Sequence, residues 1–590
     1  MQNDSNINVK PATSDFWTSR TALWASMAML PAIVYMAVIW RTTANTPQGD
    51  GYIASIFAVL YYLDADSLFE KISHTLWTYF QHRAVLTKIA VLSEYAILGH
   101  LDMHILCFFG NLMLCVLVYL IARNILQHAL PTYSMLIASL MILSIYSWSV
   151  ATWPLCTYFY YGTTMFAFAC FYLLDLPRPH IFLAAVCSWL AAFTMANGLL
   201  SIVIGSLIVI YHQHYNKRYS SLQLQFWSAS VIGCLAVHFA TMNVFSTDLY
   251  GAKSIEESFI NLSGRAIDFL ESMGAAPFFP DENRYGKIVL GCTILATMAA
   301  ITVSIATSRK QPVSPAIFGL MLFSTGTLFL TSLFRYSAGG NDGYQFFTAT
   351  NMAAIFVIAT GQIDHKRHRF LPPLMLITAL LFNLNALISN HGKMLQHRNS
   401  MTKALESSLL IDKPDNTSWV DVITYEGMAR NIYTPLQSHQ ALKIPTAVNT
   451  LEQCPVSNTQ AAGNITSTTS AEAFAMKVSL TLPTQSIHDN VALVLCGQKN
   501  YRLTLSSINL DTDNKNGMTM DVLLDKREYE HATYRAYLQN GPAVMALPEL
   551  LTIPAAELHD RRTFDCQIMK NTFTFKKGFY PIIEYYCQNI

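Results

Sequence analysis

The sequence lacks charge over long stretches of its first two thirds. Residues 125–174 contain no Asp, Glu, Lys or Arg, and similar charge-free stretches recur up to residue 389. A bilayer core about 30 Å thick needs roughly 20 apolar residues per helical crossing. Charged groups are excluded from such crossings because burying one at mid-depth is costly. After residue 389 the chain turns polar and stays so, which predicts a polytopic helical membrane domain followed by a soluble tail.

The apolar stretches predict about eleven membrane spans. They cover residues 21–40, 103–122, 133–151, 156–174, 181–195, 197–212, 226–243, 288–307, 315–333, 344–362 and 371–389. The fifth and sixth are short and meet at Ala196-Asn197-Gly198, where we expect a tight turn at the membrane face.

The short loops on one side of the predicted bundle are basic. The even-numbered spans are followed by Arg123, Arg178, Lys217-Arg218, Arg309-Lys310 and Lys366-Arg367-Arg369. The opposite short connectors carry no basic residue around Trp153 and only Arg335 within residues 334–343. Since basic loops stay in the cytoplasm, the segment 1–20 is predicted to be cytoplasmic and the tail from about residue 393 extracytoplasmic.

Within the membrane domain, residues 21–392, two predicted outer loops are long, at 41–102 and 244–287. Both keep apolar periodicity, which favours helices lying in the membrane interface. Residues 84–99 form an apolar stretch interrupted by Lys88 and Glu94. We reject this stretch as a further span, because it would reverse the sidedness and spoil the distribution of basic residues.

Other scarcities limit the function. A formal net charge of +1 argues against nucleic-acid binding. No cleavable signal is evident, since the first apolar run is long enough to span the membrane. Of the 11 cysteines, Cys454, Cys496, Cys566 and Cys587 lie in the tail. In an oxidising compartment these four cysteines allow two disulfides in any of three connectivities. No pair of them has the spacing of a zinc site.

The tail divides into a mixed connector, 393–470, and a β-rich domain, 471–590. Short alternating stretches separated by turns favour a β-sandwich; they cover residues 474–482, 491–496, 501–505, 518–524 and 533–538. The run Asp511-Thr512-Asp513-Asn514 resembles a calcium loop. Lys515 stands at the fifth position, however, and the glycine comes one residue late. A hairpin turn is the better interpretation.

Ionisable residues on the predicted outer side form three groups. The first loop carries Asp50, Asp64, Asp66, Glu70, His82 and Arg83; the second carries Asp248, Glu256, Glu257, Arg265, Asp268, Glu271, Asp281, Glu282 and Arg284; and the connector 334–343 carries Arg335 and Asp342. If the interface helices fold back over the bundle, all three groups face one outer cavity.

Carboxylates beside arginine at a membrane surface suit transfer from a lipid phosphate. A general base deprotonates an acceptor hydroxyl, while cations stabilise the departing phosphate. Arginine binds two phosphate oxygens at once. Structural roles stay open for each group: Asp64 and Asp66 as surface or capping residues, His82-Arg83 as an interface anchor, and Arg335-Tyr336 as a headgroup contact.

A family resemblance rests on several of these motifs. The features are an acidic residue soon after the first span, interface helices, a His-Arg pair in the long outer loop, and then the second span. Residues 79–122 match best, followed by Ala196-Asn197-Gly198-Leu199 and Phe334-Arg335-Tyr336. Over residues 20–390 the chain resembles bacterial polytopic glycosyltransferases of the GT-C fold. Their first-loop signature Glu-His-Arg reads Gln81-His82-Arg83 here.

This resemblance implies a lipid-linked sugar donor, usually a polyprenyl phosphate, and transfer on the extracytoplasmic face. The acid near the end of the first span would act as base or orient the acceptor, which selects Asp50. Asp64 and Asp66 are second choices or ligands of a divalent cation, Mg²⁺ or Mn²⁺. His82, Arg83, Arg335 and Tyr336 are expected to bind the donor phosphate or sugar. Gln81 removes a negative charge beside His82-Arg83, which puts a catalytic role of the motif in doubt.

The expected activity is therefore that of a membrane glycosyltransferase in the bacterial inner membrane. Its acceptor would be an envelope glycan, a lipid or a protein; without a Trp-Trp-Asp motif, protein N-glycosylation is not expected. Two alternatives stay open. A transporter or lipid flippase usually has repeated halves and ionisable residues at the midplane, and neither is visible here. A non-catalytic assembly protein with a glycan-binding tail fits the departure at Gln81.

Overall fold

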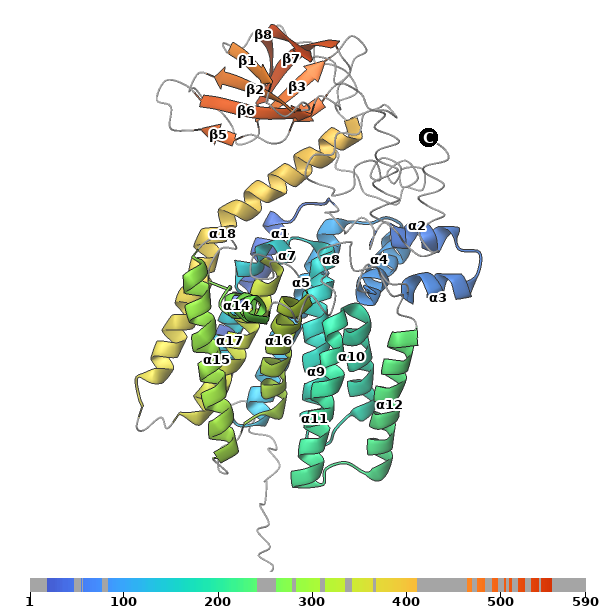
Figure 1. Ribbon diagram of the computed structural model, residues 1–590, viewed down its shortest axis with the longest axis vertical. Coiled ribbons are helices and arrows are strands. Elements are labelled where there is room, and N and C mark those ends of the chain that lie inside the picture. The colour runs from blue at the N-terminus through green and yellow to red at the C-terminus, as the bar shows by residue number, and fades with distance from the viewer. Residues whose placement is uncertain are drawn as a thin grey trace, which may run out of the picture.

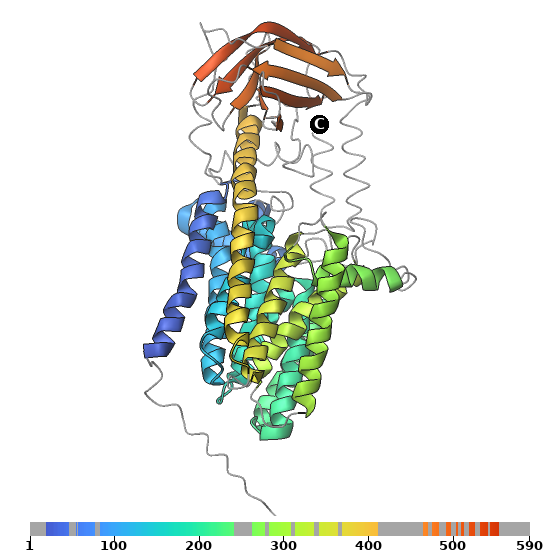
Figure 2. The same cartoon turned by 90° about the vertical axis from the view of Figure 1, so that its left-hand side faces the viewer.

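Figure 1 shows the computed structural model of the chain. It describes residues 19–46, 55, 57–76, 83–240, 262–277, 283–307, 313–334, 342–363 and 368–410, together with eight strands between residues 464 and 553. The long helices run side by side in one bundle, as the two perpendicular views agree (Figures 1 and 2).

Eight helical stretches in the described residues are long and apolar enough to cross a membrane. They are α1 (Ser19–Thr42), α5 (Met103–Gln127), Ser134–Ala151, Ala196–Asn216, α12 (Ser221–Ala240), Arg284–Ser304 of α15 (Arg284–Thr307), α16 (Pro315–Phe334) and Leu371–Arg398 of α18 (Leu371–Leu410). The protein is thus a multi-pass membrane protein, and each of the eight coincides with a span predicted from the sequence.

The other three predicted spans are also helical but do not meet that criterion. The fourth consists of α8 (Pro154–Cys156), the π-helical segment η3 (Thr157–Gly162) and α9 (Thr163–Asp175). The fifth is α10 (Ile181–Thr194), with 14 residues, and the tenth is α17 (Gln345–Gln362) after the short η7 (Asp342–Tyr344). The 3-10 turn η4 (Ala196–Gly198) joins α10 to α11 (Leu199–Asn216), as expected. The total of eleven crossings stays a prediction.

The helix of the third span is interrupted, and asparagines of α18 donate hydrogen bonds to backbone carbonyls at the interruption. Helix α6 (Ser134–Ile142) gives way to η2 (Ile145–Ser147) and α7 (Trp148–Ala151). Asn383 Nδ2 donates to the carbonyl oxygen of Leu140 at 2.7 Å, and Asn390 Nδ2 donates to that of Ile145 at 3.3 Å. In a membrane, backbone groups released by a break must be bonded inside the protein. This need accounts for amides on an otherwise apolar helix.

Short helices cover one end of the bundle. Helices α2 (Phe57–Asp64), α3 (Leu68–Leu76) and α4 (Val85–Leu98) come from the first predicted outer loop, and α14 (Leu262–Met273) comes from the second. Figure 1 places all four toward the same end. We call this the outer end and the opposite one the inner end, following the predicted sidedness. Helix α4 has 14 residues and is not among the eight stretches. Its location in the membrane interface stays a prediction.

Two glycines allow α14 to lie directly on α15. A Cβ atom at Gly291 would lie 2.0 Å from the carbonyl oxygen of Leu270, and one at Gly274 would lie 1.9 Å from that of Lys287. Both contacts are with backbone, which cannot move aside as a flexible side chain can. The backbones of α14 and α15 therefore touch at this crossing.

Helix α18 is longer than its predicted span. The apolar stretch ends at residue 389, but the helix continues to Leu410. The extension contains Lys393, Arg398, Lys403 and Glu406, which are good helix formers and too polar for the bilayer. The first part of the predicted mixed connector, from residue 393 to residue 410, is thus a continuation of the last membrane helix.

Eight strands follow in two antiparallel sheets. One sheet has the order β1-β2-β6-β5 and the other β4-β3-β7-β8. The strands are β1 (Asn464–Thr469), β2 (Ala475–Leu482), β3 (Val491–Cys496), β4 (Leu503–Leu505), β5 (Asn509–Asp511), β6 (Met518–Asp525), β7 (Ala532–Asn540) and β8 (Ala543–Ile553). Strands β5 and β6 pair antiparallel, and the connecting residues 512–517, where a hairpin turn is predicted, lie outside the described residues. Face-to-face packing of the sheets as a sandwich domain stays a prediction. Cys454, Cys566 and Cys587 lie outside the described residues.

The close crossing of α14 and α15 gives a test of the bundle. We expect Gly291→Ala to lower the free energy of unfolding by about 1–3 kcal/mol, because the new methyl group meets backbone. Gly392→Ala in α18 is the matched control, since a Cβ there has no neighbour within 4 Å. It should leave stability unchanged or raise it by up to about 1 kcal/mol. Unfolding in detergent, followed by tryptophan fluorescence, measures both. Equal behaviour of the two variants would contradict the crossing.

Candidate functional site

Most of the residues selected from the sequence lie outside the described part of the chain. These are Asp50, His82, Arg335 and Tyr336, together with the side chain of Asp64, which is the last residue of α2. Their predicted convergence therefore stays a prediction. Asp66 and Arg83 are described with their side chains, and they differ sharply in environment.

Asp66 is exposed and stands just before a helix cap. The backbone N–H groups of Asp66 and Ser67 donate to Glu70 Oε2 at 3.0 and 3.2 Å, and the N–H of Glu70 donates to Ser67 Oγ at 3.2 Å. This reciprocal arrangement is a capping box at the start of α3. The described residues include no group of three metal-type ligands. A divalent cation at Asp64 and Asp66 stays a prediction.

Arg83 is buried at the outer end, directly before α4. Its side chain is 3% exposed, and its Nη2 donates to the carbonyl oxygen of His238 at 2.7 Å. The guanidinium lies 5.1 Å from the centre of the Phe193 ring, a cation–π distance. Burial lowers the pKa of Arg83, but a guanidinium stays charged throughout the physiological range. The sequence motif thus places a permanent cation inside the protein.

Lys88 adds a second buried basic group one turn further along α4. It is 7% exposed, and its Nζ donates to the carbonyl oxygen of Thr75 at 3.3 Å. Burial, and secondly the charge of Arg83, lower the pKa of Lys88 to about 7. A bound anion would reverse both effects, because it compensates the desolvated charge. Arg83 and Lys88 together favour an anionic ligand at this place.

Glu94 is the acidic counterpart on the same helix. It is 7% exposed, and burial raises its pKa to about 8; the backbone N–H of Asp102 acts in the opposite direction, and the charge of Asp102 raises it further. Asp102 itself caps α5 by accepting from the N–H groups of His104 and Ile105. Sequence analysis treated Lys88 and Glu94 only as interruptions of an apolar stretch. Their burial follows from the tertiary packing of α4.

A third buried cation, Arg265, lies on α14. Its Nη1 donates to Asp268 Oδ2 and to the carbonyl oxygen of Ser332, both at 3.4 Å. Ser332 is in the last turn of α16, which ends at Phe334, next to the predicted site residue Arg335. The sequence named Arg265 among nine ionisable residues of the second loop without distinguishing it. Only its burial singles it out.

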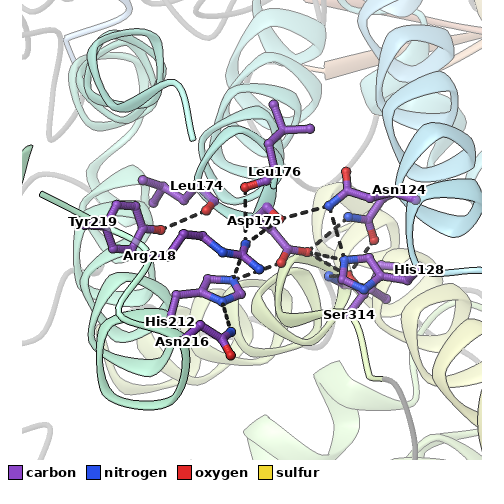
Figure 3. Close-up of polar contacts among 12 residues, drawn as sticks. Asn124, His128, Leu174, Asp175, Leu176, His212, Asn216, Arg218, Tyr219 and Ser314 are labelled. Carbon is purple, nitrogen blue, oxygen red and sulfur yellow. Dashed lines mark hydrogen bonds and ion pairs between the residues drawn. The ribbon is translucent and has the colours of Figure 1, made fainter. Parts of the chain in front are cut away.

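The inner end carries a different polar cluster, centred on Asp175 at the end of α9 (Figure 3). Asp175 is fully buried; His212 Nε2 lies 3.0 Å from its Oδ1, and His128 Nε2 lies 2.7 Å from its Oδ2. Asn124 Nδ2 and Ser314 Oγ also donate to Oδ2, at 3.2 and 3.3 Å. An ionised carboxylate only accepts, so both imidazoles present an N–H to it. We call these five residues the Asp175 cluster.

The Asp175 cluster joins helices that are distant in the sequence. Asn124 belongs to α5, His212 to α11, and Ser314 caps α16 by accepting from the N–H of Ile317 at 3.2 Å. Arg218 Nη1 donates to the carbonyl oxygens of Asp175 and Leu176 at 2.9 and 3.2 Å. Four helix ends are thereby fixed to one carboxylate. Sequence reasoning missed the cluster because its members lie far apart along the chain.

The comparisons with known proteins add one structural similarity. Neither the protein-family models nor the curated proteins include a match to this chain. Among solved structures, the chain is similar to the crystal structure of ArnT from Cupriavidus metallidurans bound to undecaprenyl phosphate. The TM-score is 0.41 and the sequence identity 9%, over 85% of this chain and 98% of that one.

The Asp175 cluster predicts a large loss of stability when its carboxylate is removed. Asp175→Asn places an amide N–H against groups that donate, and we expect it to lower the free energy of unfolding by about 3 kcal/mol. The exposed Asp66→Asn should change it by less than about 0.5 kcal/mol. Denaturant titration in detergent compares the two. A loss at Asp175 no larger than that at Asp66 would show that the cluster does not hold the inner end together.

Proposed function

We propose that this protein is a membrane glycosyltransferase. It moves a sugar from a polyprenyl-phosphate-linked donor to an envelope glycan, lipid or protein acceptor on the extracytoplasmic face. The observation that carries the proposal is the pair of buried basic residues, Arg83 and Lys88, beside an interface helix at the outer end. Two such groups five residues apart, one just before α4 and one on it, attract an anion, and a lipid phosphate is the anion present at that depth.

The proposed reaction uses few residues. Asp50 accepts the proton of the acceptor hydroxyl as the acceptor oxygen forms a bond to the anomeric carbon of the sugar. The bond from that carbon to the phosphate oxygen breaks, and the polyprenyl phosphate leaves as an anion. Arg83 and Lys88 stabilise the charge that develops on it, with His82, Arg335 and Tyr336 as the further donor-binding residues. The tail has no assigned role in this step.

The Asp175 cluster supports an enzyme over a transporter. Alternating access requires the inner end of a transporter to open and close. Here a fully buried carboxylate joins the inner ends of α5, α9, α11 and α16. Separating these ends would expose or leave unpaired several buried hydrogen-bonding groups, at a cost in free energy for each. A reaction reached from the outer leaflet leaves these bonds intact.

The base role of Asp50 is tested with purified protein and synthetic polyprenyl-phosphate-linked sugars. Asp50→Asn should slow transfer by about 10²–10⁴-fold, because the amide cannot accept the proton. Glu70→Gln, which changes a helix-capping carboxylate of the same loop, is the control and should leave transfer near wild type. Undiminished transfer in Asp50→Asn would remove Asp50 from the mechanism. Gradient-driven flux of lipid or sugar in liposomes, without transfer, would favour the transporter.

Lys88 predicts a pH dependence of donor binding. A sugar-linked polyprenyl phosphate is a phosphodiester and keeps one negative charge, so changes in affinity above neutral pH report on the protein. Binding should raise the pKa of Lys88 above its value of about 7 and take up a proton. The bound state then holds more protons, and affinity should fall as pH rises from about 7 to 9, by at most about tenfold per unit. Lys88→Arg should flatten this slope. The same slope in both proteins would exclude Lys88.

A further inference from the structure

Helix α4 is bounded by a left-handed residue at each end. Ala84 has φ 53° and Gly99 has φ 72°, and these two residues flank the helix Val85–Leu98. A positive φ is uncommon for a non-glycine residue and costs free energy at Ala84. At its start the chain is fixed by the N–H of Ala84, which donates to the carbonyl oxygen of Thr194 at 3.3 Å. Helix α4 is therefore a short rod between two sharp changes of chain direction.

The packed side of α4 fits closely against the bundle. Leu86 lies against Gly162 of the π-helical segment, where a Cβ atom would come within 2.4 Å of Leu86 Cδ2. Val91 is buried on the same helix, whereas Ile89 and Ile97 are exposed on its other side. Helix α4 packs against η3, α10 and the start of α5 on the bundle side, and α2 and α3 also contact it. We call the surface formed by η3, α10 and the start of α5 the seat of α4.

Glu94 lies on this packed side, where burial disfavours its ionised form. In the described part of the chain no side chain donates a hydrogen bond to its carboxylate. Two ionisable groups of the seat interact electrostatically with Glu94: Asp102, which caps α5, and Tyr158 of η3. Lys88 lies on α4, and Arg83 lies two residues before its start and donates to the backbone carbonyl of His238 of α12. An ionised carboxylate beside another acid, without a cationic partner, is strongly disfavoured there.

We propose that the neutral form of Glu94 holds α4 in its seat, and that Glu94 thereby positions Arg83 and Lys88 for the donor phosphate. The role of Arg83 and Lys88 in binding the donor phosphate rests on the proposed glycosyltransferase function. The effect of Glu94 on the packing of α4 does not depend on that function. Glu94 is a positioning residue: it acts through α4 and is not assigned any contact with substrate.

The linkage to pH has a defined sign. In the seated state Glu94 keeps its proton up to about pH 8, whereas in water a glutamate loses it near pH 4.3. The seated state therefore holds more protons between these values, and seating weakens as pH rises through this range, by up to tenfold per unit. Lys88 acts oppositely, because its lowered pKa of about 7 makes seating easier as pH rises above that value. The two contributions cancel between about pH 7 and 8, so the effect of Glu94 is visible alone from about pH 5 to 7.

Hydrogen exchange of residues 85–98, corrected for intrinsic rates, measures the opening of α4 directly. In the wild type we expect protection of this segment to fall from pH 5 to 7 and to level off from pH 7 to 8. Glu94→Gln keeps the size of the side chain and cannot ionise, so its α4 should remain protected across the range. Glu70→Gln is the matched control and should follow the wild type. A wild-type profile that is flat from pH 5 to 7, or equal slopes in wild type and Glu94→Gln, would overturn the proposal.

A second readout separates this inference from the proposed function. The affinity for a polyprenyl phosphodiester should be less sensitive to pH between 5 and 7 in Glu94→Gln than in the wild type. A difference in exchange without any difference in affinity would overturn the positioning of Arg83 and Lys88 by Glu94. Failure of the glycosyltransferase assay itself, with both differences present, would count against the proposed reaction and support the role of Glu94.

Discussion

The structure depends on the cost of placing charge in an apolar bundle. Among the described residues of the membrane domain, the buried aspartate, glutamate, lysine and arginine side chains lie near its two ends. The surroundings of four of these side chains show how the cost of burial is lowered. Asp175 accepts from two imidazoles, an amide and a hydroxyl. Arg83 donates to a carbonyl and stacks on a ring, whereas burial favours the neutral forms of Lys88 and Glu94.

These arrangements give the two ends different mechanical properties. At the inner end the carboxylate of Asp175 on α9 accepts hydrogen bonds from α5, α11 and the start of α16. At the outer end the basic residues sit on or beside interface helices, and one of these, α4, is bounded by left-handed residues. A substrate that enters from the outer leaflet would meet the part of the protein that can adjust most cheaply.

The sequence predicted the helices well because charge-free stretches report directly on the bilayer. Its failures have physical causes. The predicted fourth span ends at residue 174, so Asp175 lies just beyond it, and its partners His212 and Ser314 lie 37 and 139 residues away. Lys88 and Glu94 lie on a segment whose neighbours come from tertiary packing. Strand β1 falls in a Thr- and Ser-rich segment that composition marks as low-complexity. Asp50, His82, Arg335 and Tyr336 stay predictions.

The most direct test of the account is a structure of the protein in a lipid nanodisc with a polyprenyl-phosphate-linked sugar. The account predicts the phosphate at the outer end, within hydrogen-bonding distance of the Arg83 guanidinium, and the sugar beside Asp50. Lipid phosphate bound at the inner end near the Asp175 cluster, or a sugar far from Asp50 with Arg83 still bonded only within the protein, would contradict it.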